Sequence, residues 1–218
     1  MSIDATEVVR LPPAPVGSLV TVGWTQAAIA VYSALQLNTM VNLIMYIEMH
    51  APLLIDFRNH AFSWTTPMEA FPVDAVHSGL QTEPTSVDAP PFFELPGNDL
   101  DDLLWEMGIN SFGGAAAFWL PAGGRYKLTR WPNLTRNAHS MQQMQMIAML
   151  GNSYLSTSEL AKLANVEESE AQRLINALSL MRIVSQSSSA PAAAVAVAPT
   201  AASKRRSLFA RLRKRLGR

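Results

Sequence analysis

An uncharged stretch of mostly small residues divides this chain near its carboxyl end. From residue 185 to residue 203 the sequence contains only Ser, Ala, Pro and Val, apart from Gln186 and Thr200. Such a composition cannot supply a hydrophobic core and is typical of a flexible linker. We therefore predict a linker over residues 187–203, a folded part before it, and a separate tail after it, residues 204–218.

The composition of the chain excludes several classes of protein. Of its 218 residues, 49% are hydrophobic and 16% are charged, which excludes a wholly disordered chain. The absence of cysteine excludes disulfides, thiol catalysis and cysteine-ligated zinc. No two of the four histidines have the spacing of a metal-binding helix, and neither a phosphate-binding loop nor a dinucleotide fingerprint occurs. We expect no metal, no cofactor and no enzymatic activity.

The formal net charge of zero conceals three unequal blocks. Residues 1–124 carry 13 acidic and two basic residues, and residues 125–203 carry four acidic and seven basic residues. Residues 204–218 carry eight basic residues and no acidic one. This asymmetry predicts that the tail has a partner of its own, an anionic membrane surface or a nucleic acid. The alternative is that the tail folds back onto the acidic first block.

The tail combines its charge with an apolar stripe. At about 100° per residue, Leu208, Phe209, Leu212 and Leu216 fall within one arc, and most of the basic residues fall outside it. A basic amphipathic helix of this kind suits an anionic membrane surface. Charge alone would also suit nucleic acid, or would only aid solubility. The predicted membrane- or polyanion-binding residues are Lys204, Arg205, Arg206, Leu208, Phe209, Arg211, Leu212, Arg213, Lys214, Arg215, Leu216 and Arg218.

The first residues do not have the pattern of a secretory signal. They are acidic and precede Pro12, Pro13 and Pro15, so we expect a loose arm over residues 1–18. We also expect a cytoplasmic protein, peripheral at the inner face of the membrane where the tail binds lipid. From Leu11 to Ile47 no residue is charged, but polar residues interrupt the run. A spanning helix needs about 20 predominantly apolar residues, so the pattern favours a buried core helix over a transmembrane one.

Residues 19–130 are predicted to form an acidic domain of mixed α+β class. The predicted elements are a helix over residues 24–37, a second helix or buried strand over 40–49, a strand over 53–64, a short helix over 99–107 with Asn98 as its cap, and a strand over 115–120 that leads through a turn into 125–131. Residues 66–97 contain six prolines and are too long for an ordinary connection. They predict an extended binding loop or a loosely ordered linker.

Residues 131–186 are predicted to form a helical module. The predicted elements are helices over 141–150, 159–163 and 167–181, a turn at Ala164-Asn165 and a closing strand at Ile183-Val184. Ser156 or Thr157 precedes Glu159 with the spacing of a capping box. The phrase STSELAKLANVEESEAQRLINAL, from Ser156 onward, resembles the helix-turn-helix core of winged-helix domains, over about residues 140–185.

This resemblance implies that the long helix would lie in a DNA major groove with its first residues at the bases. Those first residues include Glu167, Glu168 and Glu170, which DNA phosphates repel. The residues of base-reading type are Gln172, Arg173 and Asn176. We therefore expect a structural or protein-binding role for the module, with DNA reading as the alternative.

A second basic group surrounds an aromatic residue at the start of this module. Arg125, Lys127, Arg130 and Arg136 flank Trp131. Basic residues around an aromatic ring can neutralise and stack on nucleic acid. The alternative is that Trp131 packs in the junction between the two halves of the chain. The predicted partner or nucleic-acid surface comprises Arg130, Trp131, Arg136, Lys162 and Arg173.

Two polar clusters are candidates for chemistry. Asp56, Arg58 and His60 alternate along one face of the predicted strand and could meet in a site. The second cluster fits the first turn of a helix, where acidic groups interact well with the helix dipole; its members are Asp99, Asp101 and Asp102. Clusters without a motif are usually structural, so we expect neither to be catalytic.

These patterns together predict a bacterial, cytoplasmic, non-enzymatic regulatory or adaptor protein. It would bind another protein through its folded domains, and the tail would tether it to an anionic membrane surface or a partner. The second hypothesis is a transcriptional regulator with an amino-terminal sensor domain. The third is an integral membrane protein anchored by residues 20–47.

Overall fold

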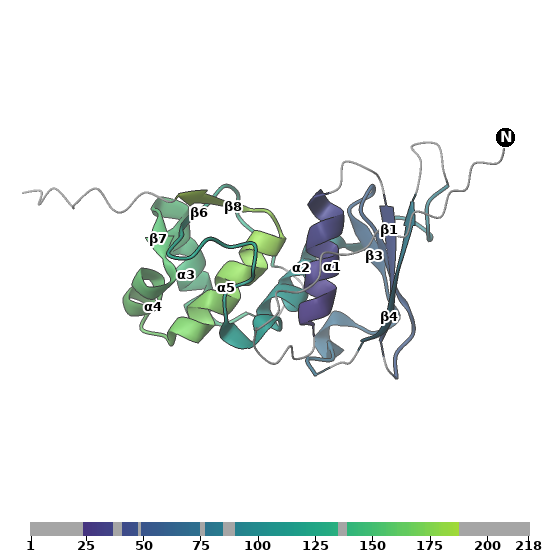
Figure 1. Cartoon of the computed structure of the whole chain (residues 1–218), viewed down its shortest axis with the longest axis horizontal. Coiled ribbons are helices and arrows are strands. Elements are labelled where there is room, and N and C mark those ends of the chain that lie inside the picture. The colour runs from purple at the N-terminus through teal and green to yellow at the C-terminus, as the bar shows by residue number, and fades with distance from the viewer. Residues whose placement is uncertain are drawn as a thin grey trace, which may run out of the picture. The chain divides into compact units, whose positions relative to one another are not determined.

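The computed structural model describes residues 24–36, 41–47, 49–74, 77–84, 90–134 and 139–187 (Figure 1). The chain divides into two units, residues 1–187 and residues 188–218, and every described residue belongs to the first. The predicted arm, the tail helix, Arg136 and the predicted linker after Ser187 lie outside the described residues.

The first half of this unit contains a five-stranded antiparallel sheet with the strand order β4-β1-β2-β3-β5. Its elements are α1 (Thr25–Gln36), β1 (Val41–Ile47), β2 (Leu53–Asp56), β3 (Ala61–Ser63), η1 (Met68–Ala70), β4 (His77–Pro84) and β5 (Asn98–Asp99). The helix predicted over 24–37 is therefore present, and the second segment is a strand. Helices and antiparallel strands together give the α+β class that the sequence predicts.

Alternation along the strands explains which face of this sheet is buried. Leu43 and Met45 of β1 are fully buried and pair with Ile55 and Leu53 of β2. Side chains at every second position of a strand share a face, so these four form one apolar layer. Helix α1 lies beside β1 (Figure 1) and adds a face of small residues to the same core.

The strand predicted over residues 53–64 is wrong, because a tight turn divides it into β2 and β3. The Asp56 carboxylate accepts hydrogen bonds from the Asn59 backbone N–H at 3.1 Å and from Asn59 Nδ2 at 2.8 Å. Aspartate side chains that bind the backbone a few residues on stabilise turns. Residues 57–60, the β2–β3 turn, reverse the chain so that Ile55 pairs with Phe62.

Residues 66–97 are also more regular than the predicted loop or linker. They contain η1 and the eight-residue edge strand β4, which pairs with β1. Proline stands at the last position of β4, where a missing backbone N–H disrupts little. The prolines therefore limit this strand without preventing it.

The next elements connect the two halves of the unit. They are α2 (Leu100–Ile109), η2 (Phe112–Gly114) and, in place of the strand predicted over 115–120, an irregular segment with a turn that the Leu120 N to Ala117 O hydrogen bond closes. The predicted cap of α2 is off by one residue. Asp99 accepts the capping hydrogen bond from Asp101 N, while Asn98 pairs with Phe62 in the sheet.

The second half contains three helices and a three-stranded antiparallel sheet of order β7-β6-β8. Its elements are β6 (Arg125–Leu128), α3 (Met141–Asn152), β7 (Leu155–Ser156), α4 (Thr157–Ala164), α5 (Glu168–Leu180) and β8 (Val184–Ser187). Residues 125–128, which the sequence pattern places at the end of the first domain, form the central strand of this sheet. Residue 187, the first of the predicted linker, closes β8.

Local signals place α4 and α5 as the sequence predicts. Ser156 and Glu159 form the predicted capping box, in which each side chain accepts a hydrogen bond from the other residue's backbone N–H. Asn165 adopts the left-handed conformation at φ 54°, which asparagine tolerates better than most residues and which ends α4.

The two halves share one hydrophobic core. Thr25 of α1 accepts a hydrogen bond from Phe112 N, and Tyr32 of α1 stacks on Trp119 with ring centroids 4.1 Å apart. Trp119 Nε1 in turn donates to Ser179 Oγ of α5 at 3.0 Å. Residues 112–120, here called the strap, therefore join α1 to α5.

Within the described ranges, no helix has the length and apolar character that crossing a membrane requires. The part of the uncharged run that the structure describes forms α1 of 12 residues and then β1.

Candidate functional site

The site begins with the short pairing between β3 and β5. Ala61 pairs with Asp99, and Leu100 N donates to the carbonyl oxygen of His60 at 3.1 Å. This pairing brings the last residue of the β2–β3 turn next to the first turn of α2. His60 adopts φ 49°, an unusual conformation for a residue with a side chain.

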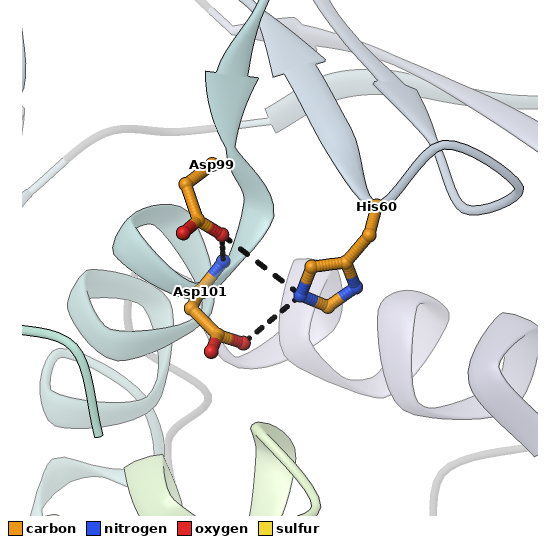
Figure 2. Close-up of side chains that lie close together, drawn as sticks. All are labelled: His60, Asp99 and Asp101. Carbon is orange, nitrogen blue, oxygen red and sulfur yellow. Dashed lines mark hydrogen bonds and ion pairs between the residues drawn. The ribbon is translucent and has the colours of Figure 1, made fainter. Parts of the chain in front are cut away.

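The Asp101 carboxylate lies at the centre of the site, between the His60 ring and the Arg130 guanidinium group. His60 Nε2 lies 3.0 Å from Asp101 Oδ1 (Figure 2), and Arg130 Nη2 donates to Asp101 Oδ2 at 2.8 Å. His60 Nε2 also lies 4.0 Å from Asp99 Oδ1. The Asp101 side chain is only 6% exposed, whereas those of His60 and Arg130 are about half exposed. A buried carboxylate is costly unless it is paired, and here it has two partners.

These contacts change the acidity of two groups in opposite directions. The hydrogen bond to Asp101 raises the pKa of His60, against the opposing effect of burial. Burial alone would raise the pKa of Asp101, but the hydrogen bonds from His60 and Arg130 outweigh it and lower that pKa. The site therefore favours a charged His60 and a charged Asp101 together.

The geometry also bears on metal binding. One ligand atom from each of His60, Asp99 and Asp101 lies within 4.8 Å of the others. However, both Asp101 oxygens already bind cationic or ring N–H groups, and Asp99 Oδ1 accepts from the backbone at the start of α2. Protonation of His60 would also remove its ligand atom. We therefore assign the cluster as an ion-pair network, whose direct chemical capacity is to gain or lose a proton at His60.

The structure does not bring Asp56, Arg58 and His60 into one site. Asp56 is fully buried, holds the turn through Asn59, and lies 3.8 Å from Arg58. His60 instead faces Asp101 on another element, because the turn replaces the strand face that the three residues were expected to share. The predicted helix-start role of Asp99, Asp101 and Asp102 is confirmed by their positions, and Asp101 additionally forms the network.

The residues of the predicted partner surface lie on several elements. Arg130 forms a hydrogen-bonded ion pair with Asp101, and Trp131 lies against Gly151 of α3. Trp131 is 58% exposed, which argues against the alternative that it packs inside the junction. Lys162 of α4 and Arg173 of α5 are exposed.

The strap occupies one of the polar groups, Asn176, that α5 would offer to DNA under the alternative of base reading. Asn176 Oδ1 accepts from Ala117 N at 3.1 Å, and Asn176 Nδ2 donates to the Ala115 carbonyl oxygen at 2.9 Å. Gln172 Nε2 donates to the same Asn176 oxygen, and Thr157 donates to Gln172. Of the three predicted base-reading residues, only Arg173 is exposed.

The network and the strap contacts join residues that lie far apart in the sequence, so no local pattern indicates them. His60 and Asp101 are separated by 41 residues, and Asp101 and Arg130 by 29. The contact between His60 and Asp101 depends on the pairing of β3 with β5, a strand of two residues that no pattern in the sequence marks. The acidic first turn of α2 was visible, but nothing in it indicated a partner.

Comparison with known proteins adds no relationship at this point: no protein-family model, no curated protein and no solved structure matches the chain.

Proposed function

We propose that this chain is a non-enzymatic regulatory or adaptor protein. Its folded unit would bind another protein, and its basic tail would tether it to an anionic membrane surface. We also propose that the part containing α3, α4 and α5 is a winged-helix-like module used for packing and protein contact. The succession α3, β7, α4, turn, α5 and β8 supports that assignment.

The observation that most supports the proposal is that the strap forms hydrogen bonds with Asn176 of α5 and covers this side chain. A recognition helix must present its polar side chains to base edges. Asn176 is 1% exposed, and its side-chain amide forms hydrogen bonds with the backbone of the strap. Withdrawing it for DNA would leave the buried N–H of Ala117 and the half-buried carbonyl group of Ala115 without this partner, which is costly.

The acidic residues at the start of α5 also argue against DNA binding by this helix. Glu167 and Glu168 are exposed and Glu170 is half-buried, in the turn that would approach the phosphates. Acidic groups there stabilise the helix through its dipole but are repelled by nucleic acid. Exposed Arg173 and Lys162 offset only part of this repulsion.

The tail supports the tether because its charge and its apolar stripe are separated on a helix. Eight basic residues provide attraction to anionic lipid, worth about 1 kcal/mol for each one near the surface. A segment of this length is marginal as an isolated helix, so it would fold on contact with the membrane. The apolar stripe distinguishes this use from nucleic-acid binding, which needs charge alone.

The test uses sedimentation of the full chain with vesicles of phosphatidylcholine, alone or mixed with phosphatidylglycerol. We expect binding to the anionic vesicles only, and loss of binding when residues 204–218 are removed. A matched variant replaces Leu208, Phe209, Leu212 and Leu216 with Ser and keeps every basic residue. It should lose most of its vesicle binding, because the insertion energy is gone while the charge remains.

Duplex DNA in the same assay separates the two functions. The proposal predicts that the truncated chain binds DNA weakly or not at all, and that Arg173→Ala changes nothing. Salt-dependent DNA binding that survives truncation and weakens in Arg173→Ala, together with no vesicle binding, would instead establish the transcriptional regulator.

A further inference from the structure

The Asp101 carboxylate connects three separately positioned parts of the folded unit. His60 ends the β2–β3 turn of the five-stranded sheet, and Asp101 lies in the first turn of α2. Arg130 follows β6 of the three-stranded sheet. Through one buried carboxylate, the turn of the first sheet is therefore connected to the end of a strand in the second.

Hydrogen bonds from backbone N–H groups hold each of these parts without using the side chains of His60, Asp101 or Arg130. Leu100 N donates to His60 O at 3.1 Å, and Asp101 N donates to Asp99 Oδ1 at 3.0 Å. Thr129 N, next to Arg130, donates to Ile183 O at 2.8 Å. The His60 ring can thus change its charge without losing its place beside Asp101.

The charge balance around the ring changes with one proton. The charged groups that act on His60 are Asp101 of α2, Asp99 of β5 and Arg130 after β6. With the ring protonated, two cations face two carboxylates. With the ring neutral, Arg130 is the one cation left among these groups, and the hydrogen bond between His60 and Asp101 loses its positively charged partner. The ring is half exposed, so it exchanges protons with solvent directly.

We propose that His60 and Asp101 form a proton-controlled latch that ties the β2–β3 turn to α2 and, through Arg130, to the segment after β6. The latch is tight when His60 is protonated and weak when His60 is neutral. It acts within the folded unit, so it does not depend on the proposed function.

The direction of the pH response follows from the pKa shifts of His60 and Asp101. The pKa of His60 is raised above 6.5, so its stabilising contribution is complete below the unfolded value and is lost as pH rises through the folded value. The pKa of Asp101 is lowered below 3.8, so this carboxylate stays charged across that whole range. The latch therefore responds near neutral pH, the range in which histidine titrates.

The first measurement is an NMR titration of the histidine rings in the full chain, with His60→Gln used to assign the His60 signal. We expect the wild-type His60 ring to titrate above 6.5. Asp101→Asn should lower that pKa, because it removes the main partner. Arg130→Gln should raise it, because Arg130 opposes protonation. Asp99→Asn can still cap α2 and should lower the pKa slightly.

The second measurement tests whether protonation tightens the junction. We would compare the urea midpoints of wild type and His60→Gln at about pH 5.5 and about pH 8.5, on either side of the usual range of histidine titration. The wild type should exceed the variant at the lower pH, and the difference should shrink at the higher pH. Exchange of the Leu100 amide should be slower at the lower pH than the intrinsic pH dependence of exchange alone accounts for.

Two outcomes would overturn the latch. One is a His60 ring whose pKa does not fall in Asp101→Asn and does not rise in Arg130→Gln. The other is a difference in urea midpoint that is the same at both pH values. If Asp101→Asn does not fold, Arg130→Gln still tests the proposal, because its shift has the opposite sign.

Discussion

Gly108 of α2 lies against Ala177 of α5 so closely that a Cβ atom on Gly108 would be 2.3 Å from the Ala177 Cα. Helix axes approach to this degree only where one helix lacks a side chain. The same glycine position lies between two buried helices of the shared core. The close approach of α2 to α5 at this point therefore depends on the absence of a side chain at residue 108.

Gly108→Ala should destabilise the protein strongly, since the clash is with backbone that cannot rotate away. Overpacking of a core costs about 1–3 kcal/mol, and we expect the upper end of that range. The free energy of unfolding in urea is the measurement. The matched control is Gly151→Ala in α3, where the nearest atom, on Trp131, lies at an ordinary 3.5 Å. It should be neutral or stabilising by up to about 1 kcal/mol, because alanine is the better helix former. Equal effects of the two substitutions would contradict the close contact.

Asn176→Ala should show how firmly the strap holds α5. The substitution leaves the buried Ala117 N–H and the half-buried Ala115 carbonyl group without their partner. An unpaired buried group costs about 1–3 kcal/mol, so we expect a loss in that range. Arg173→Ala, one turn earlier and exposed, should stay within about 0.5 kcal/mol of wild type.

Hydrogen exchange provides the structural readout for the same variant. In Asn176→Ala the Ala117 amide should exchange faster, while amides of β1 should keep their protection. Unchanged protection at Ala117 would mean that Asn176 does not hold the strap.

Two tryptophans that look alike in the sequence should behave differently. Trp119 stacks on Tyr32 and donates to Ser179, whereas Trp131 is 58% exposed. Trp119→Ala should cost at least about 2 kcal/mol, in line with other large losses of buried aromatic contact. Trp131→Ala should cost less than about 1 kcal/mol, because it removes mainly exposed surface. A large loss for Trp131→Ala would restore the packing role that its exposure argues against.

The elements that sequence patterns predict well are those held by local signals. The helix starting after Ser156 has its capping box within four residues, and α1 has a continuous apolar pattern. Both signals act over one or two helical turns, so they are readable without knowledge of the rest of the chain.

The elements that sequence patterns miss depend on partners far along the chain. The turn after Asp56 was hidden because its residues alternate like a strand, and only the Asn59 bonds show that the chain reverses there. The segment 115–120 is apolar enough for a strand, but its backbone groups bond to Asn176 rather than to a neighbouring strand. The site around Asp101 joins residues that only the sheet pairing brings together.

Glu159→Gln tests the ion pair that connects β6 to α4. Arg125 Nη1 donates to Glu159 Oε1 at 2.8 Å, and the Glu159 side chain is 39% exposed. Gln at this position can keep the capping box but cannot form the ion pair. A partly exposed pair is worth about 0.2–1 kcal/mol, so we expect a loss in that range at pH 7.

The loss of stability in Glu159→Gln should become smaller as pH falls. The backbone hydrogen bond from Ser156, together with Arg125, lowers the pKa of Glu159 below 4.5. A carboxyl group with a lowered pKa contributes stability above its unfolded pKa and loses it as pH falls through the folded value. The difference in free energy of unfolding between wild type and Glu159→Gln should therefore shrink as pH falls below 4.5. In an Arg125→Gln background the same substitution should cost less at pH 7, because the ion pair is already absent. A difference that persists unchanged under acid would show that the ionised carboxylate contributes nothing at this junction.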